Sequence, residues 1–215
     1  MKIKGLVDED FVNYKKPSMF ISTYTCSFKC CEECGQAVCQ NLPLVSQPTV
    51  EVDNAELAQR YVNNNITKAV VLGGLEVLDD VKDVFEFVRV FRRYSDDDIV
   101  IYTGYNEEEV KPCIDRLKAM TSNIIIKFGR FVPDQQPHYD EVLGVKLASD
   151  NQKGVRICCR LFLIQTKKCT SRSQKLLKRM TVIVVVVSLR IKTQNVCVKN
   201  LKISNLQDCA TVNAL

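Results

Sequence analysis

The feature that most constrains the fold is an alternation of short apolar segments with longer amphipathic ones between Ser18 and Leu147. The apolar segments have the length and composition of buried strands, and they span residues 19–24, 69–72, 99–102 and 124–127. Short apolar strands separated by helices are joined as parallel βαβ units. The pattern therefore predicts an α/β fold with a mostly parallel sheet.

The segments between these strands show helical spacing of apolar residues. The predicted helices span residues 54–63, 81–94 and 107–120. Asn54 is predicted to cap the first of them, since its side chain can accept a hydrogen bond from a free N–H group of the first turn. The strands and helices alternate as a repeated βαβ arrangement requires.

Each predicted strand ends in a polar or glycine-rich turn. These turns are a cysteine-rich loop after residue 24, Gly73-Gly74, and Thr103-Gly104-Tyr105. Ligands of parallel sheets bind at the carboxyl ends of the strands. We therefore expect the three turns to meet at one rim of the sheet and to form the functional site there.

The cysteine-rich loop points to a metal or a cluster. Five of the eleven cysteines lie between Cys26 and Cys39, and no secretory signal precedes them. Three thiolates can hold three irons of a four-iron cluster and leave the fourth iron open. The set Cys26, Cys30, Cys34 and Cys39 would equally supply the four ligands of a zinc site. Spacing alone leaves cluster and zinc open.

The remaining composition excludes some classes of protein. No apolar run reaches the roughly 18 residues that a membrane-spanning helix needs, so we expect no membrane association. Together with the thiol-rich loop, this predicts a cytoplasmic protein in which cysteines stay reduced. The net charge of +5 is concentrated after residue 156. That basic segment has a single aromatic residue, Phe162, which makes nucleic-acid binding unlikely.

Two segments of the cysteine loop resemble the radical S-adenosylmethionine family, and within it the activating proteins of anaerobic ribonucleotide reductase. Cys26-Ser27-Phe28-Lys29-Cys30 matches the first half of the family's C-x3-C-x2-C loop, and Cys39-Gln40-Asn41 is similar to its last cysteine with the Asn that follows. Six extra residues separate the two halves. Cys34 lies in this insertion and is an alternative ligand.

Further motifs follow in the order of the family. Gly73-Gly74-Leu75-Glu76 resembles the family's Gly-Gly-Glu, with Leu75 interposed, and Tyr102-Thr103-Gly104-Tyr105 resembles a Thr-Gly-Tyr segment of the reductase activators. Phe128-Gly129-Arg130-Phe131 and Ser149-Asp150-Asn151-Gln152 are similar to two further stretches. A surface ion pair explains Arg130 equally well. The resemblance covers about residues 1–157, which we assign as a 4Fe-4S domain.

The resemblance implies an incomplete, open (β/α) barrel and a defined chemistry. A [4Fe-4S] cluster held by Cys26, Cys30 and Cys39 would reductively cleave S-adenosyl-L-methionine (SAM) and form a glycyl radical on anaerobic ribonucleoside-triphosphate reductase. A flavodoxin or ferredoxin would donate the electron. The implied cofactor-binding residues are Gly73, Gly74, Glu76, Thr103, Gly104 and Tyr105.

Two other classes of function remain open from the residues. One is a zinc or iron–sulfur protein with a structural or electron-transfer role and no radical chemistry. The other is a radical SAM enzyme that acts on a small molecule. Metal content separates the first from the implied activator, and stimulation of SAM cleavage by a metabolite separates the second.

Residues 158–215 form a basic tail without the strand–helix alternation. Its longest apolar run, 182–187, is typical of one strand. Regrouping the codons by one frame lets segments 182–186, 195–198 and 209–212 encode Cys-x-Cys pairs. These pairs resemble the catalytic β chain of ferredoxin–thioredoxin reductase. We hypothesise that the tail is a frame-shifted remnant of such a domain, which the nucleotide sequence of the gene would test.

Overall fold

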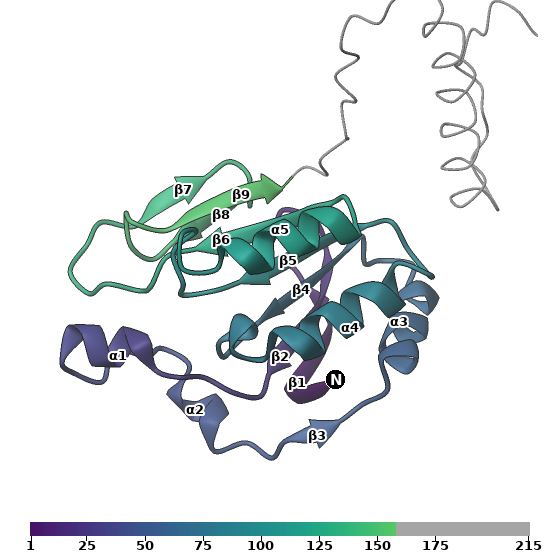
Figure 1. The fold of residues 1–215 in the computed structure, drawn as a ribbon, viewed down its shortest axis with the longest axis horizontal. Helices are drawn as coiled ribbons and strands as arrows, with labels where there is room; N and C mark the ends of the chain where they lie inside the picture. The colour runs from purple at the N-terminus through teal and green to yellow at the C-terminus, as the bar shows by residue number, and fades with distance from the viewer. Residues whose placement is uncertain (158–215) are drawn as a thin grey trace, which may run out of the picture. The chain divides into compact units, whose positions relative to one another are not determined.

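The computed structural model describes residues 1–157, and they contain a seven-stranded mixed sheet in the order β3-β1-β2-β4-β5-β6-β9 (Figure 1). The four central strands run parallel: β2 (Ser18–Thr23), β4 (Ala69–Gly73), β5 (Asp98–Tyr102) and β6 (Ile124–Phe128). Antiparallel strands flank them: β1 (Lys2–Asp10) and β3 (Val50–Glu51) on one side and β9 (Lys153–Ile157) on the other. The predicted α/β fold with its parallel central strands is confirmed.

Three helices connect the parallel strands and cover one face of the sheet. They are α3 (Asn54–Asn63), α4 (Val81–Phe91), which follows the 3-10 turn η1 (Val77–Asp80), and α5 (Lys111–Met120). Their apolar sides pack on alternate strand residues such as Val70, Leu72 and Ile101 in one buried cluster. Removing this apolar surface from water is the main stabilising contribution to the fold.

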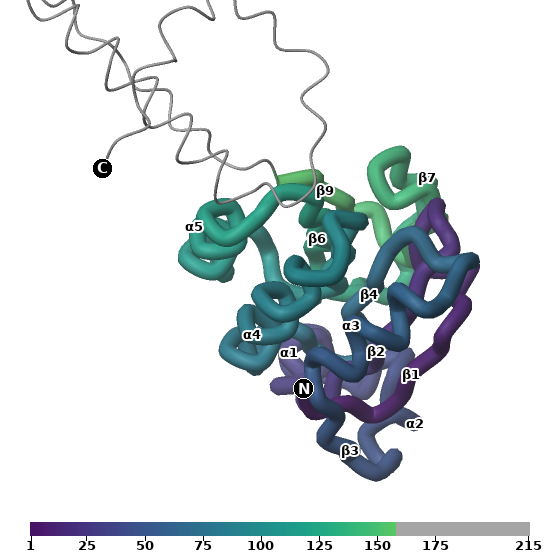
Figure 2. The backbone as a smooth tube through the Cα atoms, turned by 90° about the vertical axis from the view of Figure 1, so that its right-hand side faces the viewer, coloured from purple at the N-terminus to yellow at the C-terminus, as the bar shows by residue number. Residues whose placement is uncertain are grey.

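A hairpin packs against the other face of the sheet. It consists of β7 (His138–Asp140) and β8 (Val145–Leu147) and contributes Leu143 and Leu147 to a second buried cluster. The strand residues that meet it, including Val71 and Val100, alternate with those that face the helices, because successive side chains of a strand point to opposite faces. Figure 2 shows α4 and α5 on one side of the sheet and β7 on the other.

Within the described residues the sheet stays open and ends at β3 and β9, in agreement with an open α/β fold rather than a closed barrel. The long segment between β2 and β3 contains two short helices, α1 (Lys29–Cys34) and α2 (Leu42–Val45). Phe28 and Gly35, which flank α1, both adopt left-handed backbone conformations. In the described part of the chain, no helix has the length and apolarity to cross a membrane.

Some predicted boundaries were wrong. The cap of α3 is Asp53, whose Oδ1 accepts hydrogen bonds from the N–H groups of Ala55 at 2.7 Å and Glu56 at 3.2 Å, so Asn54 belongs to the helix itself. The helix predicted from 107 begins at Lys111, and the one predicted through 94 ends at Phe91. The basic tail, its apolar segment 182–187 and the altered reading frame lie outside the described residues.

Candidate functional site

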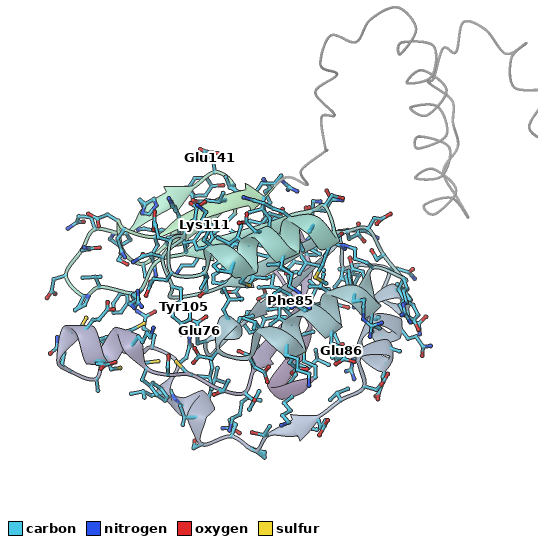
Figure 3. All side chains as sticks on the ribbon, viewed as in Figure 1. Glu76, Phe85, Glu86, Tyr105, Lys111 and Glu141 are labelled. Carbon is cyan, nitrogen blue, oxygen red and sulfur yellow. The ribbon has the colours of Figure 1, made fainter. Side chains whose placement is uncertain are left out.

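Segments that follow the four parallel strands meet in one pocket, at the rim where the sequence predicts the site. The cysteine loop comes from β2, Glu76 follows the glycine turn after β4, Gly104-Tyr105 comes from β5, and Arg130 follows β6. The side chains that line the pocket include Cys26, Lys29, Cys30, Glu76, Tyr105 and Arg130. Figure 3 shows Glu76 and Tyr105 near α1, at the carboxyl ends of the strands.

Glu76 connects two of these turns. Its Oε1 accepts hydrogen bonds from the Thr103 hydroxyl at 2.6 Å and the Leu78 N–H at 3.0 Å, and its Oε2 accepts one from the Gly104 N–H at 2.8 Å. Burial raises the pKa of Glu76, although these three donors act in the opposite direction. The carboxyl group is therefore fixed in orientation at the edge of the pocket.

Three of the predicted cofactor-binding residues, Gly73, Gly74 and Thr103, do not line the pocket. Thr103 is buried and holds Glu76 in place. A Cβ atom on Gly73 would lie 3.0 Å from the ring of Phe20, and one on Gly74 would lie 3.0 Å from Ser22, so both glycines allow close packing at the end of β4.

Two of the predicted ligands, Cys26 and Cys30, lie in the pocket itself as half-buried free thiols. The N–H of Phe28 donates to Cys26 Sγ at 3.3 Å. Burial raises the pKa of Cys26 to about 11 and also raises that of Cys30. Both thiols are thus protonated without a metal, and metal binding releases their protons.

Gly104 packs directly against Cys30 and Glu76. A Cβ atom at this position would lie 3.4 Å from Cys30 Sγ and 3.3 Å from Glu76 Oε2. These are tight van der Waals contacts, so a side chain here would fit only with a small shift of Glu76 or Cys30. The glycine thus allows both groups to lie close to the turn after β5, a role that the sequence did not assign to it.

The third predicted ligand, Cys39, is half-buried on the same loop but does not line the pocket. It is close enough to Cys30 for its charge to act on that thiol, after burial and other neighbours. The side-chain amide of Asn41 donates to the Gly74 carbonyl at 2.6 Å and ties this end of the loop to the glycine turn. Cys34, the alternative ligand, is the last residue of α1 and also lies outside the pocket.

Residues that the sequence did not assign complete the pocket. Arg130 is only 6% exposed, and its guanidinium donates two hydrogen bonds of 2.7 Å to Glu109 and lies 3.2 Å from Glu33 of α1. The hydrogen bonds from Arg130 hold the pKa of Glu109 at about 2. Arg130 is therefore a buried cation with two partly exposed carboxylate partners, and it links α1 to the segment before α5.

Tyr105 lies between two cations. The ammonium of Lys29 is 4.6 Å and the guanidinium of Arg130 is 5.6 Å from the centre of its ring, distances typical of cation–π contacts. Its hydroxyl donates to Asp79 at 2.6 Å, and the N–H of Ser27 donates to the same carboxylate. Asp79 thus joins the cysteine loop to the turn after β5.

Residues 149–152, one of the motifs noted in the sequence, form hydrogen bonds to the turn that follows β6. The Asn151 amide donates to the Arg130 carbonyl at 2.9 Å, and the Gln152 amide donates to the Gly129 carbonyl at 3.3 Å. Gly129 has a φ of 96° and no space for a Cβ, which would lie 2.9 Å from the Asn151 carbonyl oxygen. These contacts hold the main chain that positions Arg130.

The ligand types fit an iron–sulfur cluster. Among residues 1–157, no three Cys, His, Asp or Glu side chains are close enough to hold a single metal ion, which is what a tetrahedral zinc site requires. The thiolates of a four-iron cluster bind separate irons. Cys26 and Cys30 face one pocket, with an N–H group directed at a sulfur and Cys39 on the same loop. For Cys26, Cys30 and Cys39 to bind one cluster together, Cys39 has to move closer to that pocket.

The molecule is thus an α/β protein with a thiol-rich loop at the carboxyl end of β2, the first of its parallel strands. Residues 17–153 match the family model described as the 4Fe-4S single cluster domain, and the chain belongs to this family. No curated protein and no solved structure matches the chain. The family decides between the two metal centres that the cysteine spacing left open, in favour of the [4Fe-4S] cluster.

Proposed function

We propose that this protein reductively cleaves SAM and thereby forms a glycyl radical on an anaerobic ribonucleoside-triphosphate reductase. The observation that carries the proposal is the meeting of the cysteine loop, Glu76 after the glycine turn, and Gly104-Tyr105 in one pocket, with Asn41 of the loop bonded to the Gly74 carbonyl. When bound, the cluster supplies the single electron that breaks the sulfur–carbon bond of SAM, giving methionine and a 5′-deoxyadenosyl radical. Cytoplasmic flavodoxin or ferredoxin is the proposed electron donor.

The chain's own residues have defined roles in this proposal. Cys26, Cys30 and Cys39 would hold the cluster, which would supply the site for SAM. Glu76, fixed in orientation by three hydrogen-bond donors, would accept a hydrogen bond from the SAM amino group. Tyr105 forms a wall of the pocket. The open sheet leaves the rim accessible to a loop of the partner protein.

The test is anaerobic reconstitution of the full chain, followed by iron and sulfide analysis and a SAM cleavage assay with dithionite. We expect four irons per chain and release of methionine. Cys26→Ala and Cys30→Ala should each lose the cluster and the cleavage activity. Cys34→Ala is the matched control from the same loop and should keep both, while Cys39→Ala should behave like Cys30→Ala.

A second assay identifies the product. The loaded protein is mixed with a glycyl-radical reductase and SAM, and the radical is measured by electron paramagnetic resonance. A radical on the reductase supports the proposal. One zinc per chain instead of iron, or a cluster that leaves SAM intact, would contradict it. Cleavage that requires a metabolite and leaves the reductase without a radical would identify an enzyme that acts on a small molecule.

A further inference from the structure

Lys127 is a buried cation without an ion-pair partner among the described residues. It is the fourth residue of β6 and only 7% exposed. Its ammonium donates a hydrogen bond of 2.7 Å to the Gly129 carbonyl. The ion pairs found in residues 1–157 do not include it. Because burying an uncompensated charge costs several kcal/mol, a cation retained here requires an anion nearby.

The position of Lys127 places it next to the thiol pocket. Its carbonyl accepts a hydrogen bond of 2.9 Å from the N–H of Thr103, whose hydroxyl binds Glu76. The next residue, Gly104, packs on Cys30. Burial lowers the pKa of Lys127 to about 8, while the charges of Glu76 and Cys30 act in the opposite direction. The side chain is therefore mainly protonated at neutral pH.

Glu76 does not form a direct ion pair with Lys127. It makes no contact with the ammonium short enough to be an ion pair. Other carboxylates at this end of the sheet already have donors, since Asp79 accepts from Tyr105 and Glu109 accepts from Arg130. The cysteine loop adds negative charge here once its thiols have lost their protons to a bound cluster. Each electron added to that cluster increases the negative charge further.

We propose that the buried ammonium of Lys127 is a fixed counter-charge that stabilises the reduced state of the cluster held by the cysteine loop. The redox step is the uptake of one electron from a chemical or protein reductant, with no bond made or broken in the protein. Lys127 favours the state with the additional negative charge, because the interaction is not screened by solvent. This inference rests on the cluster and is independent of SAM cleavage.

The test measures the midpoint potential of the cluster in the full chain, reconstituted anaerobically and titrated without SAM. Lys127→Met removes the charge, and Lys127→Gln removes it but keeps a donor for the Gly129 carbonyl. Lys127→Arg keeps the charge. The matched control is Lys153→Met on the neighbouring strand β9, whose side chain is 59% exposed and 3.7 Å from Glu107.

We expect both neutral variants to shift the midpoint potential to more negative values, with iron and sulfide content equal to that of the unaltered protein. Lys127→Arg and Lys153→Met should leave the potential close to its original value. A potential that stays unchanged in a loaded neutral variant overturns the proposal. An equal shift of the midpoint potential in Lys127→Gln and Lys127→Arg also overturns it, because the shift would then come from altered packing and not from the lost charge.

If the neutral variants take up no cluster, two other measurements test the proposal: the midpoint potential of Lys127→Arg and the folding of the neutral variants by circular dichroism. Neutral variants that stay folded without iron, beside a loaded Lys127→Arg of unchanged potential, support the requirement for charge. Loss of the fold in the neutral variants, together with a changed potential in Lys127→Arg, overturns it. A normal shift in potential without SAM cleavage would keep this inference and reject the proposed function.

Discussion

The parallel strands and the cysteine loop differ completely in burial. All five residues of β4 are buried, as are all five of β6, whereas no residue between Tyr24 and Glu51 is buried. The strands are ordered by apolar packing on both faces. The loop has no comparable burial and depends on a few polar contacts. From this difference in burial we expect the sheet to fold without a metal and the loop to gain further interactions when a metal binds.

The loop is attached to the rest of the domain by a few separate polar contacts. Asn41 binds the Gly74 carbonyl, Glu33 pairs with Arg130, and Lys4 of β1 donates to the carbonyl of Val45 at 3.0 Å. Exposed ion pairs contribute little free energy, because water screens them. These contacts orient the loop over the pocket without fixing it as firmly as core packing would.

The largest effect expected from this comparison is that of truncating a core residue. Phe91 is fully buried between Phe87 and Tyr61. Phe91→Ala should lower the free energy of unfolding by about 3–5 kcal/mol through lost burial and a cavity. Leu42→Ala in α2, where the side chain is 42% exposed, should change it by about 0.5 kcal/mol or less. Urea unfolding measures both, and similar losses would contradict the contrast.

An intermediate effect is expected at the other end of β5. Burial tends to raise the pKa of Asp98, but hydrogen bonds from Arg156 at 2.9 Å, Lys16 at 2.6 Å and Tyr14 at 2.9 Å hold it at about 2. Because the folded pKa lies below the unfolded value of 3.8, this stabilisation is present above pH 3.8 and is lost as the pH falls to about 2. Asp98→Asn should therefore cost about 2 kcal/mol at neutral pH.

The measurement is urea unfolding at neutral pH and in steps down to about pH 2. The variant should show a shallower fall in stability with acid than the unaltered protein. Asp96→Asn is the control, since that side chain is exposed. In the loop, Glu33→Gln should cost less than about 1 kcal/mol, because Glu33 is 59% exposed. A larger loss from Glu33→Gln than from Asp98→Asn would reverse the comparison.

The smallest expected difference is between two glycines with similar backbone angles. Gly74 and Gly35 have φ values of 81° and 64°. An alanine in either place costs about 1 kcal/mol for the left-handed conformation. At Gly74 its Cβ would also lie 3.0 Å from Ser22 and 3.1 Å from Leu44, whereas nothing lies within 4 Å at Gly35. Thermal unfolding should rank Gly74→Ala below Gly35→Ala, and equal values would argue against tight packing between α2 and the glycine turn.

The central strands were predictable because they are buried on both faces and read as continuous apolar runs. β1 and β9 were missed because they lie outside the parallel strands and mix charged with apolar residues, as in Lys2–Asp10 and Lys153–Ile157. The start of α5 carried a signal that was not used, since Pro112 lies in its first turn, where proline fits. Asp53 and Asn54 are both good caps, and only the extended backbone of Asp53 decides between them.

The meeting of three turns at one pocket was predictable from the topology of parallel strands. The position of Arg130 was not, because its burial depends on Glu109 and Glu33, which are distant in sequence. Lys127 did carry a signal, as the single charged residue in the apolar strand Ile124–Phe128. The place of Cys39 depends on how the six inserted residues fold, and no periodic pattern in the sequence determines that.

The left-handed conformation of Phe28 has a consequence for how the loop takes up metal. A residue with a side chain loses about 1 kcal/mol in this region relative to its right-handed alternative. Phe28 has a φ of 57° and lies between Cys26 and Cys30, so the spacing of the first two sulfurs is coupled to a single unfavourable dihedral angle. A change of Phe28 to the right-handed region on metal binding would remove this cost and change the distance between the two sulfurs.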